Sequence, residues 1–150
     1  MVGAIETVYR GYRFRSRLEA RWAVFMDTAG CQWVYEPEGF DLGDDGWYLP
    51  DFFCRHNKTH GTYIEIKPTE PNDKEINKLV SVCSIENQHG IFIWGVPGEH
   101  MAFEIHKDGF VYRELEGNEL MDILLNCPKS SLQNCINAAR AARFEHGERP

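Results

Sequence analysis

Two neighbouring segments of this sequence predict paired β-strands and constrain the fold more than any other feature. Tyr48–Phe53 and Tyr63–Lys67 are rich in aromatic and β-branched residues, and a short polar stretch lies between them. The pattern predicts two strands joined by a hairpin-like connection. Because side chains alternate between the faces of a strand, Glu65 and Lys67 lie on one face. If the two strands pair with matching faces, Asp51 joins them there.

Two carboxylates and an ammonium group on one sheet face are costly to bury without partners. Mg²⁺ prefers oxygen ligands and is usually held by one or two carboxylates together with waters and phosphates. We therefore expect Asp51 and Glu65 to bind a divalent cation, with the Ile66 carbonyl as a further ligand. Lys67 is expected to orient or deprotonate an attacking water, or to offset charge on a phosphate. The alternative is an ordinary ion pair between Lys67 and either carboxylate.

The segment after Ser16 predicts the first helix. Arg17–Asp27 carries large apolar side chains at helical spacing, and Gly30 ends the pattern. Glu19 lies on the flank of this apolar stripe, from which it can reach the edge of a sheet that the helix packs on. Ser16 and Glu19 also match a capping box, in which the glutamate bonds back to the backbone N–H of the serine. A cap and a place in the metal site are both open to Glu19.

The remaining segments predict a mixed set of strands and helices. Further strands are expected at residues 32–36, 91–95, 101–106 and 110–113, and helices at residues 73–86, 119–125 and 130–144. Residues before the first helix are expected to be irregular or weakly extended. We therefore expect an α/β (α+β) fold, a mixed sheet flanked by helices, with its core at about residues 9–113 and C-terminal helices at about residues 119–146.

Length and composition predict one globular domain. The chain has 150 residues, 43% hydrophobic and 26% charged, which suits a single domain of residues 1–150 with a proper core. No apolar run approaches membrane-spanning length, and the first residues lack a basic and apolar leader. We therefore expect a cytoplasmic protein without a membrane partner.

The distribution of charge qualifies any role in nucleic-acid binding. The formal net charge of −7 is unfavourable for such a role when taken as an average. However, arginines cluster within residues 10–21, and lysines lie one turn apart on the helix predicted at residues 73–86. A solvated helix face is the alternative for the lysines. The residues expected to contact phosphates are Arg13, Arg15, Arg17, Lys74 and Lys78.

Other motifs that carry chemistry are missing from the sequence. The five cysteines are scattered, odd in number and without a Cys-x-x-Cys pair, so that no disulfide framework or zinc knuckle is indicated. Cys54, His56 and His60 lie close together but have no evident fourth zinc ligand. The acidic turn at residues 43–46 is too short for a calcium loop. Without a Gly-rich phosphate loop, we expect no nucleotide cofactor.

The order Glu19, Pro50-Asp51 and Glu65-Ile66-Lys67 resembles the motif of the PD-(D/E)xK nuclease superfamily. The resemblance covers about residues 9–95. Within the superfamily, Phe14–Glu19 and Ile64–Pro68 look like small phage-encoded endonuclease-like proteins and the nuclease domain of the end-cleaving subunit of heteromeric transposases. Ala141–Gly147 is also similar to the phage proteins.

The resemblance implies a restriction-endonuclease-like core and hydrolysis of DNA phosphodiester bonds with Mg²⁺, for which Mn²⁺ would substitute. By position, Asp51 and Glu65 would be metal ligands, Lys67 the catalytic lysine and Glu19 an accessory acidic residue. The protein would be a DNA endonuclease of a phage or mobile element, acting in a bacterial or phage-infected host cell. Because the chain is acidic, a partner protein or a homodimer is expected to supply part of the DNA contacts.

Two other functions fit the same residues. A nuclease-fold protein that binds DNA or a host protein without cutting would be indifferent to Mg²⁺. A Holliday-junction resolvase would share the active site, dimerise and prefer four-way junctions to linear duplex.

Overall fold

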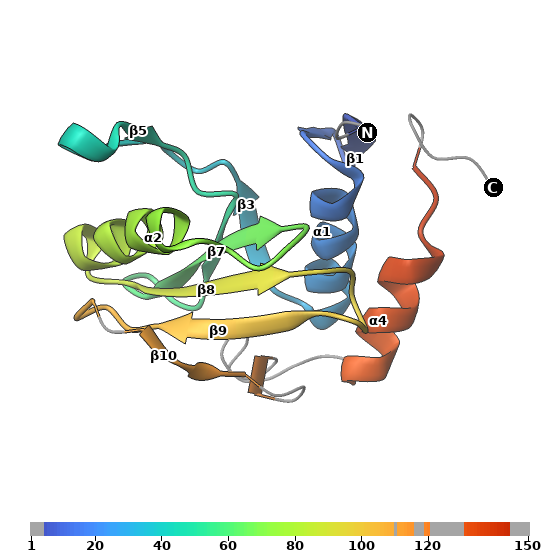
Figure 1. The fold of residues 1–150 in the computed structure, drawn as a ribbon. Helices are drawn as coiled ribbons and strands as arrows, with labels where there is room; N and C mark the ends of the chain where they lie inside the picture. The colour runs from blue at the N-terminus through green and yellow to red at the C-terminus, as the bar shows by residue number, and fades with distance from the viewer. Residues whose placement is uncertain (1–4, 110, 116–118, 121–130, 145–150) are drawn as a thin grey trace.

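The structure, a computed structural model, describes residues 5–109, 111–115, 119–120 and 131–144. Figure 1 shows the arrangement of its elements. The described helices are α1 (Arg17–Ala29), α2 (Asp73–Glu86) and α4 (Leu132–Ala141), with a 3₁₀ turn at Gly43–Asp45. The described strands are β1 (Thr7–Tyr9), β2 (Tyr12–Phe14), β3 (Gln32–Tyr35), β4 (Phe40–Asp41), β5 (Trp47–Tyr48), β6 (Phe52–Arg55), β7 (Gly61–Lys67), β8 (His89–Trp94), β9 (Met101–Ile105) and β10 (Val111–Glu114).

The main sheet is mixed and has the strand order β10-β9-β8-β7-β6-β3. β7 and β8 run parallel, whereas the other neighbours in this order run antiparallel. The hairpins β1–β2 and β4–β5 form separate two-stranded sheets. The prediction of a mixed α+β fold with a mixed sheet is confirmed.

Helices cover both faces of the main sheet. α1 packs on one face, where Trp22 and Ile64 belong to the same core cluster, and α4 packs against α1. α2 packs on the other face, where Leu79 meets Tyr63. Because both of its faces are covered, β7 is buried from Gly61 to Ile66. Tyr63 and Ile64 thus point to opposite faces, as the alternation along β7 predicts.

The helix ends follow local signals in the sequence. The N-cap Ser16 accepts the Glu19 N–H at its hydroxyl oxygen, 3.1 Å away, and α1 ends at Gly30, which has a left-handed φ of 89°. α2 begins with a capping box between Asn72 and Glu75. Much of the helix predicted at residues 119–125 lies outside the described residues. Within the described part of the chain, no helix combines the length and the apolar character needed to cross a membrane.

The predicted strand Tyr48–Phe53 is wrong in its continuity. Trp47 and Tyr48 form β5, which pairs with β4, and Phe52 begins β6 in the main sheet. Pro50 lies between them and has no backbone N–H for a strand ladder, so it breaks the strand. Asp51 therefore sits immediately before β6, where its carbonyl accepts the Glu36 N–H at 2.7 Å.

The N-terminal segment is more regular than expected. β1 and β2 form an antiparallel hairpin whose turn residues, Arg10 and Gly11, have φ values of 51° and 80°. Two successive residues with positive φ are typical of the tight turns that match strand twist.

The structure joins Cys31 to Cys54 in a disulfide, which the scattered cysteines of the sequence did not indicate. Cys31 directly precedes β3. Cys54 lies in the neighbouring strand β6, opposite Trp33 of β3, so strand pairing brings the two sulfur atoms together. Cys54 is therefore not a zinc ligand with His56 and His60.

Candidate active site

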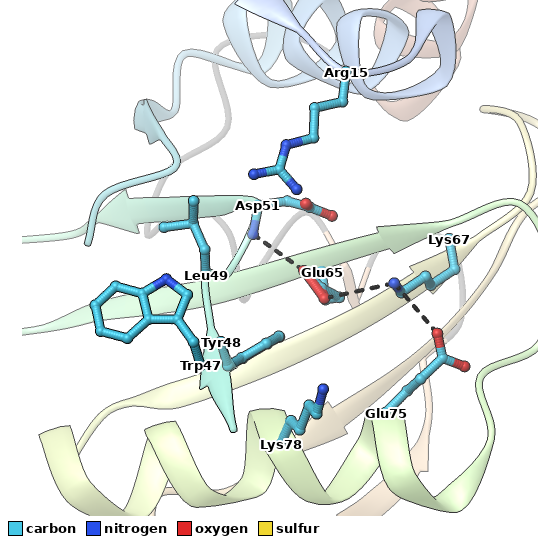
Figure 2. A pocket seen from close by; sticks show the side chains of 9 residues that line it. All are labelled: Arg15, Trp47, Tyr48, Leu49, Asp51, Glu65, Lys67, Glu75 and Lys78. Carbon is cyan, nitrogen blue, oxygen red and sulfur yellow. Dashed lines mark hydrogen bonds and ion pairs between the residues drawn. The ribbon is translucent and has the colours of Figure 1, made fainter. Parts of the chain in front are cut away.

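Asp51 and Glu65 lie side by side where the start of β6 is next to the C-terminal part of β7 (Figure 2). The register pairs Phe52 with Ile64, and its continuation by one residue places Asp51 opposite Glu65. The Asp51 N–H donates to Glu65 Oε1 at 3.1 Å, and the Ile66 N–H donates to Asp51 Oδ2 at 2.8 Å. These two hydrogen bonds hold both carboxyl groups in place next to each other.

Burial disfavours the ionisation of both carboxyl groups. Burial raises the pKa of Asp51 well above its ordinary value, and the negative charges of Glu65 and Glu19 raise it further, while the hydrogen bond from the Ile66 N–H opposes the shift. Burial also raises the pKa of Glu65, and the nearby Lys67 opposes that rise. A bound cation would relieve the repulsion that exists when both groups are ionised.

The Asp51→Asn variant is expected to be more stable than the wild type without divalent metal at neutral pH. Asparagine keeps an oxygen for the Ile66 N–H but removes one charge. A thermal midpoint about 2–4 °C higher corresponds to ~1 kcal/mol in a domain of this size. Thermal unfolding in EDTA measures this difference.

The stability advantage of Asp51→Asn over wild type should increase with pH. Carboxyl groups with a raised folded-state pKa are most favourable below the unfolded pKa, and their contribution is lost as the pH rises through the folded pKa. The advantage of Asp51→Asn should therefore be small near pH 4, about the unfolded carboxyl pKa, and grow towards neutral pH. An advantage that is largest in acid would contradict repulsion within the pair.

Lys67 lies beside the carboxylate pair and is held from its other side by α2. Its Nζ is 3.9 Å from Glu65 Oε2 and 3.2 Å from Glu75 Oε2. Burial lowers the pKa of Lys67, but the charges of Glu65, Glu75 and Asp51 outweigh it and raise the pKa above its ordinary value. Lys67 is therefore a protonated cation in this arrangement, which favours charge stabilisation over proton abstraction.

Glu75 is a site residue that the sequence analysis missed. Its Oε1 accepts the Asn72 N–H at 3.0 Å in the capping box of α2, while its Oε2 faces Lys67. The start of α2 thus fixes the carboxylate that positions the lysine. The spacing of Asn72 and Glu75 is a recognisable capping signature, but contact with Lys67 depends on how α2 packs on the sheet.

Glu19 reaches the same region from the first turn of α1. It is buried, with 6% of its surface exposed. Its Oε1 accepts the Ser16 hydroxyl at 3.0 Å, and its Oε2 accepts the Tyr35 hydroxyl at 3.1 Å. The Glu19 charge contributes to the raised pKa of Asp51. Even so, among the residues that the structure describes, no three His, Cys, Asp or Glu side chains form a group that could hold a metal ion. Asp51 and Glu65 therefore stand as a pair, and Glu19 acts on Asp51 from beside it.

The backbone of Ile66 offers a further oxygen to this pair. In a β-strand the N–H and C=O of one residue face the same neighbour. Because the Ile66 N–H donates to Asp51, the Ile66 carbonyl also faces the Asp51 side of β7. The next residue faces the other way, since the Lys67 carbonyl accepts the Gly95 N–H at 3.1 Å.

A cavity of about 360 Å³ lies over the carboxylate pair. Figure 2 shows Arg15 extending towards Asp51 from the segment before α1, and Lys78 on α2. The other predicted phosphate contacts, Arg13, Arg17 and Lys74, are not among its lining residues. The lining residues are Arg15, Trp47, Tyr48, Leu49, Asp51, Glu65, Lys67, Glu75 and Lys78.

The two arginines of β2 and the loop after it differ in their surroundings. Arg13 forms an ion pair with Glu6 in the segment before β1. Arg15 forms an ion pair with Glu36, with Nη2 2.6 Å from Oε2, and also lines the cavity. Of the N-terminal arginines expected to contact phosphates, the structure brings Arg15 to the carboxylate pair.

Tyr48 is a second lining residue that the sequence analysis missed. Its side chain is 8% exposed, and its hydroxyl lies near the Glu65 carboxylate without a well-formed hydrogen bond. Burial and the charges of Glu65 and Asp51 raise the pKa of Tyr48, so the hydroxyl stays protonated as a donor.

No protein-family model, no curated protein and no solved structure matches this chain. Its function is therefore inferred from the site itself.

Proposed function

We propose that this protein is a metal-dependent DNA endonuclease with a restriction-endonuclease-like core of the PD-(D/E)xK type. The observation that carries the proposal is the convergence of Asp51, Glu65 and Lys67 in one cavity, where the Asp51 N–H donates to the Glu65 carboxylate and the Ile66 N–H donates to the Asp51 carboxylate. We further propose that it is encoded by a phage or mobile element and acts in the cytoplasm of the host cell.

The donor set of the cavity fits a hard divalent cation. Asp51 and Glu65 supply carboxylate oxygens whose mutual repulsion a cation would relieve, and the Ile66 carbonyl faces the same side. Mg²⁺ is commonly held by one or two carboxylates, with its other positions left to water and phosphate. Mn²⁺ accepts the same ligands. When bound, either ion would polarise the phosphate and lower the pKa of a water.

The side chains around the pair have complementary roles. Lys67, protonated and positioned by Glu75, offsets the charge that develops on the phosphate. Arg15 and Lys78 extend the positive charge of the cavity and hold the flanking phosphates. Glu19 adds negative charge beside Asp51, which attracts a cation to the pair.

The proposal is tested by DNA cleavage with Mg²⁺ or Mn²⁺ and an EDTA control. Supercoiled plasmid, linear duplex, single strands and four-way junctions serve as substrates. Cutting that requires the metal supports the proposal, and preference for junctions would assign a resolvase. No cutting of any substrate, together with calorimetry that detects no metal binding, would overturn it in favour of a binding module. Metal binding without cutting would point to the partner protein or homodimer expected from the acidic net charge.

Lys78→Gln is expected to weaken DNA binding and to reduce the slope of log affinity against log salt by about 1, because each phosphate contact releases condensed counterions. Arg15→Gln is expected to do the same. Arg13→Gln is the matched control, because Arg13 pairs with Glu6 and does not line the cavity. Binding measured over a salt series gives the slopes. An equal loss in Arg13→Gln would place the DNA along the β1–β2 hairpin instead.

A further inference from the structure

Trp47 is a large apolar side chain left 69% exposed on β5. It lines the same cavity as Asp51, Glu65 and Lys67, and Figure 2 shows its indole on the side of the cavity away from Lys67. The exposed surface of this indole is not removed from water, so it contributes no hydrophobic stabilisation to the fold. It therefore requires a separate explanation.

The indole of Trp47 is held from one side by backbone. A Cβ atom added at Gly39 would lie 2.0 Å from Trp47 Cζ2 and 2.4 Å from Cε2, so the ring lies directly against Gly39. The pairing of Trp47 with Asp41 between β4 and β5 fixes the backbone that carries it. Support on one side and high exposure overall make the ring a preformed flat surface.

The charges around the β4–β5 hairpin favour contact with a base over contact with a phosphate. Its connecting turn carries Asp44 and Asp45, which repel a phosphodiester backbone. The cations of the cavity, Arg15, Lys67 and Lys78, lie elsewhere on its wall. A strand whose phosphates lie at those cations would therefore meet this hairpin with a base and not with a phosphate.

We propose that Trp47 is a stacking platform for an unpaired nucleobase next to the phosphate bound in the cavity. This inference rests on the proposed nuclease function and narrows its substrate class. The bases of a regular duplex are covered by their neighbours, so an indole stacks only on a base that is single-stranded, at a branch point or flipped out. The substrate is then DNA with an unpaired nucleotide beside the scissile phosphate.

The test measures binding of the full chain to two labelled strands of equal length, a thymidine oligonucleotide and an abasic oligonucleotide. Ca²⁺ replaces Mg²⁺ to prevent cleavage. Wild type is expected to bind the thymidine strand about 10- to 100-fold more tightly, the range for one base stacked on an aromatic ring. Trp47→Ala should lose this preference while keeping its affinity for the abasic strand, and Trp47→Phe should keep most of it.

Two further variants separate stacking from a general effect on the fold. Gly39→Ala keeps the tryptophan residue, but the added methyl group displaces its indole ring. This variant should therefore also lose the preference for the thymidine strand. Ile85→Ala removes another exposed apolar side chain, on α2 outside the cavity lining, and should keep it.

The inference is overturned if Trp47→Ala retains the base preference, or if it weakens binding of both strands equally. It is also overturned if wild type binds linear duplex DNA but neither strand. These outcomes are distinct from failure of the nuclease proposal. Metal-dependent cleavage without a base preference would remove the stacking platform alone, and a base preference without cleavage would remove the nuclease alone.

Discussion

The Lys67→Met variant is expected to cleave DNA about 10²- to 10³-fold more slowly than wild type, the loss that follows removal of one charge-stabilising group from an enzyme. Methionine keeps an unbranched apolar chain of similar length but removes the ammonium group next to Glu65 and Glu75. Initial cleavage rates at saturating Mg²⁺ measure the effect. Thermal unfolding of the variant shows whether the fold is kept.

The matched control for this variant is Lys74→Met. Lys74 lies in the first turn of α2, close to Glu75 in sequence, but outside the cavity lining. Lys74→Met makes the same change of charge as Lys67→Met and should retain nearly the full rate of DNA cleavage. An unchanged rate in Lys67→Met, or an equal loss in both variants, would contradict a role for Lys67 at the reacting phosphate.

Replacing Trp22 by alanine is expected to lower the free energy of unfolding by about 3–5 kcal/mol, the usual cost of emptying a buried aromatic site. Trp22 is fully buried in the core between α1, α4 and the sheet. Its ring centroid lies 4.9 Å from that of Phe25, and its Nε1 donates to the Gly95 carbonyl at 3.0 Å. Urea denaturation measures the loss.

Trp22→Phe separates packing from the hydrogen bond. Phenylalanine retains much of the apolar volume but leaves the Gly95 carbonyl without its donor, which should cost about 1–3 kcal/mol. Because the Gly95 N–H holds the Lys67 carbonyl, this variant also tests whether the core supports the site. Trp47→Ala is the control, since its exposed side chain should contribute little. Equal losses in Trp22→Ala and Trp47→Ala would contradict the assigned core.

The fold follows largely from local patterns. Helical spacing, Ser16 and Gly30 correctly predicted α1, and apolar runs located β8 and β9 to within a residue or two. Local patterns failed where a strand leaves one sheet for another. The segment from Tyr48 to Phe53 has strand composition throughout, yet Pro50 divides it between two sheets.

The candidate site was predictable in part for a similar reason. Alternation along β7 places Glu65 and Lys67 on one face whatever the strand pairs with. Asp51 joins them only through the register of β6 against β7, which the sequence suggests but pairing decides. Glu75 and Tyr48 come from an element packed above the face and from a separate hairpin, so their contact with the site depends on distances that no spacing encodes.

The sequence by itself determined the periodicities: which residues share a strand face, where α1 begins and ends, and which acidic residues stand next to a lysine. The tertiary structure decided what these faces meet. It brought Cys31 to Cys54, placed Glu19 beside Asp51 without assembling a three-carboxylate metal group among the described residues, and set Trp47 against Gly39 at the cavity. The physical reason is that alternation and helical spacing are properties of the local backbone, whereas burial, pKa shifts and cavities arise from contacts between distant segments.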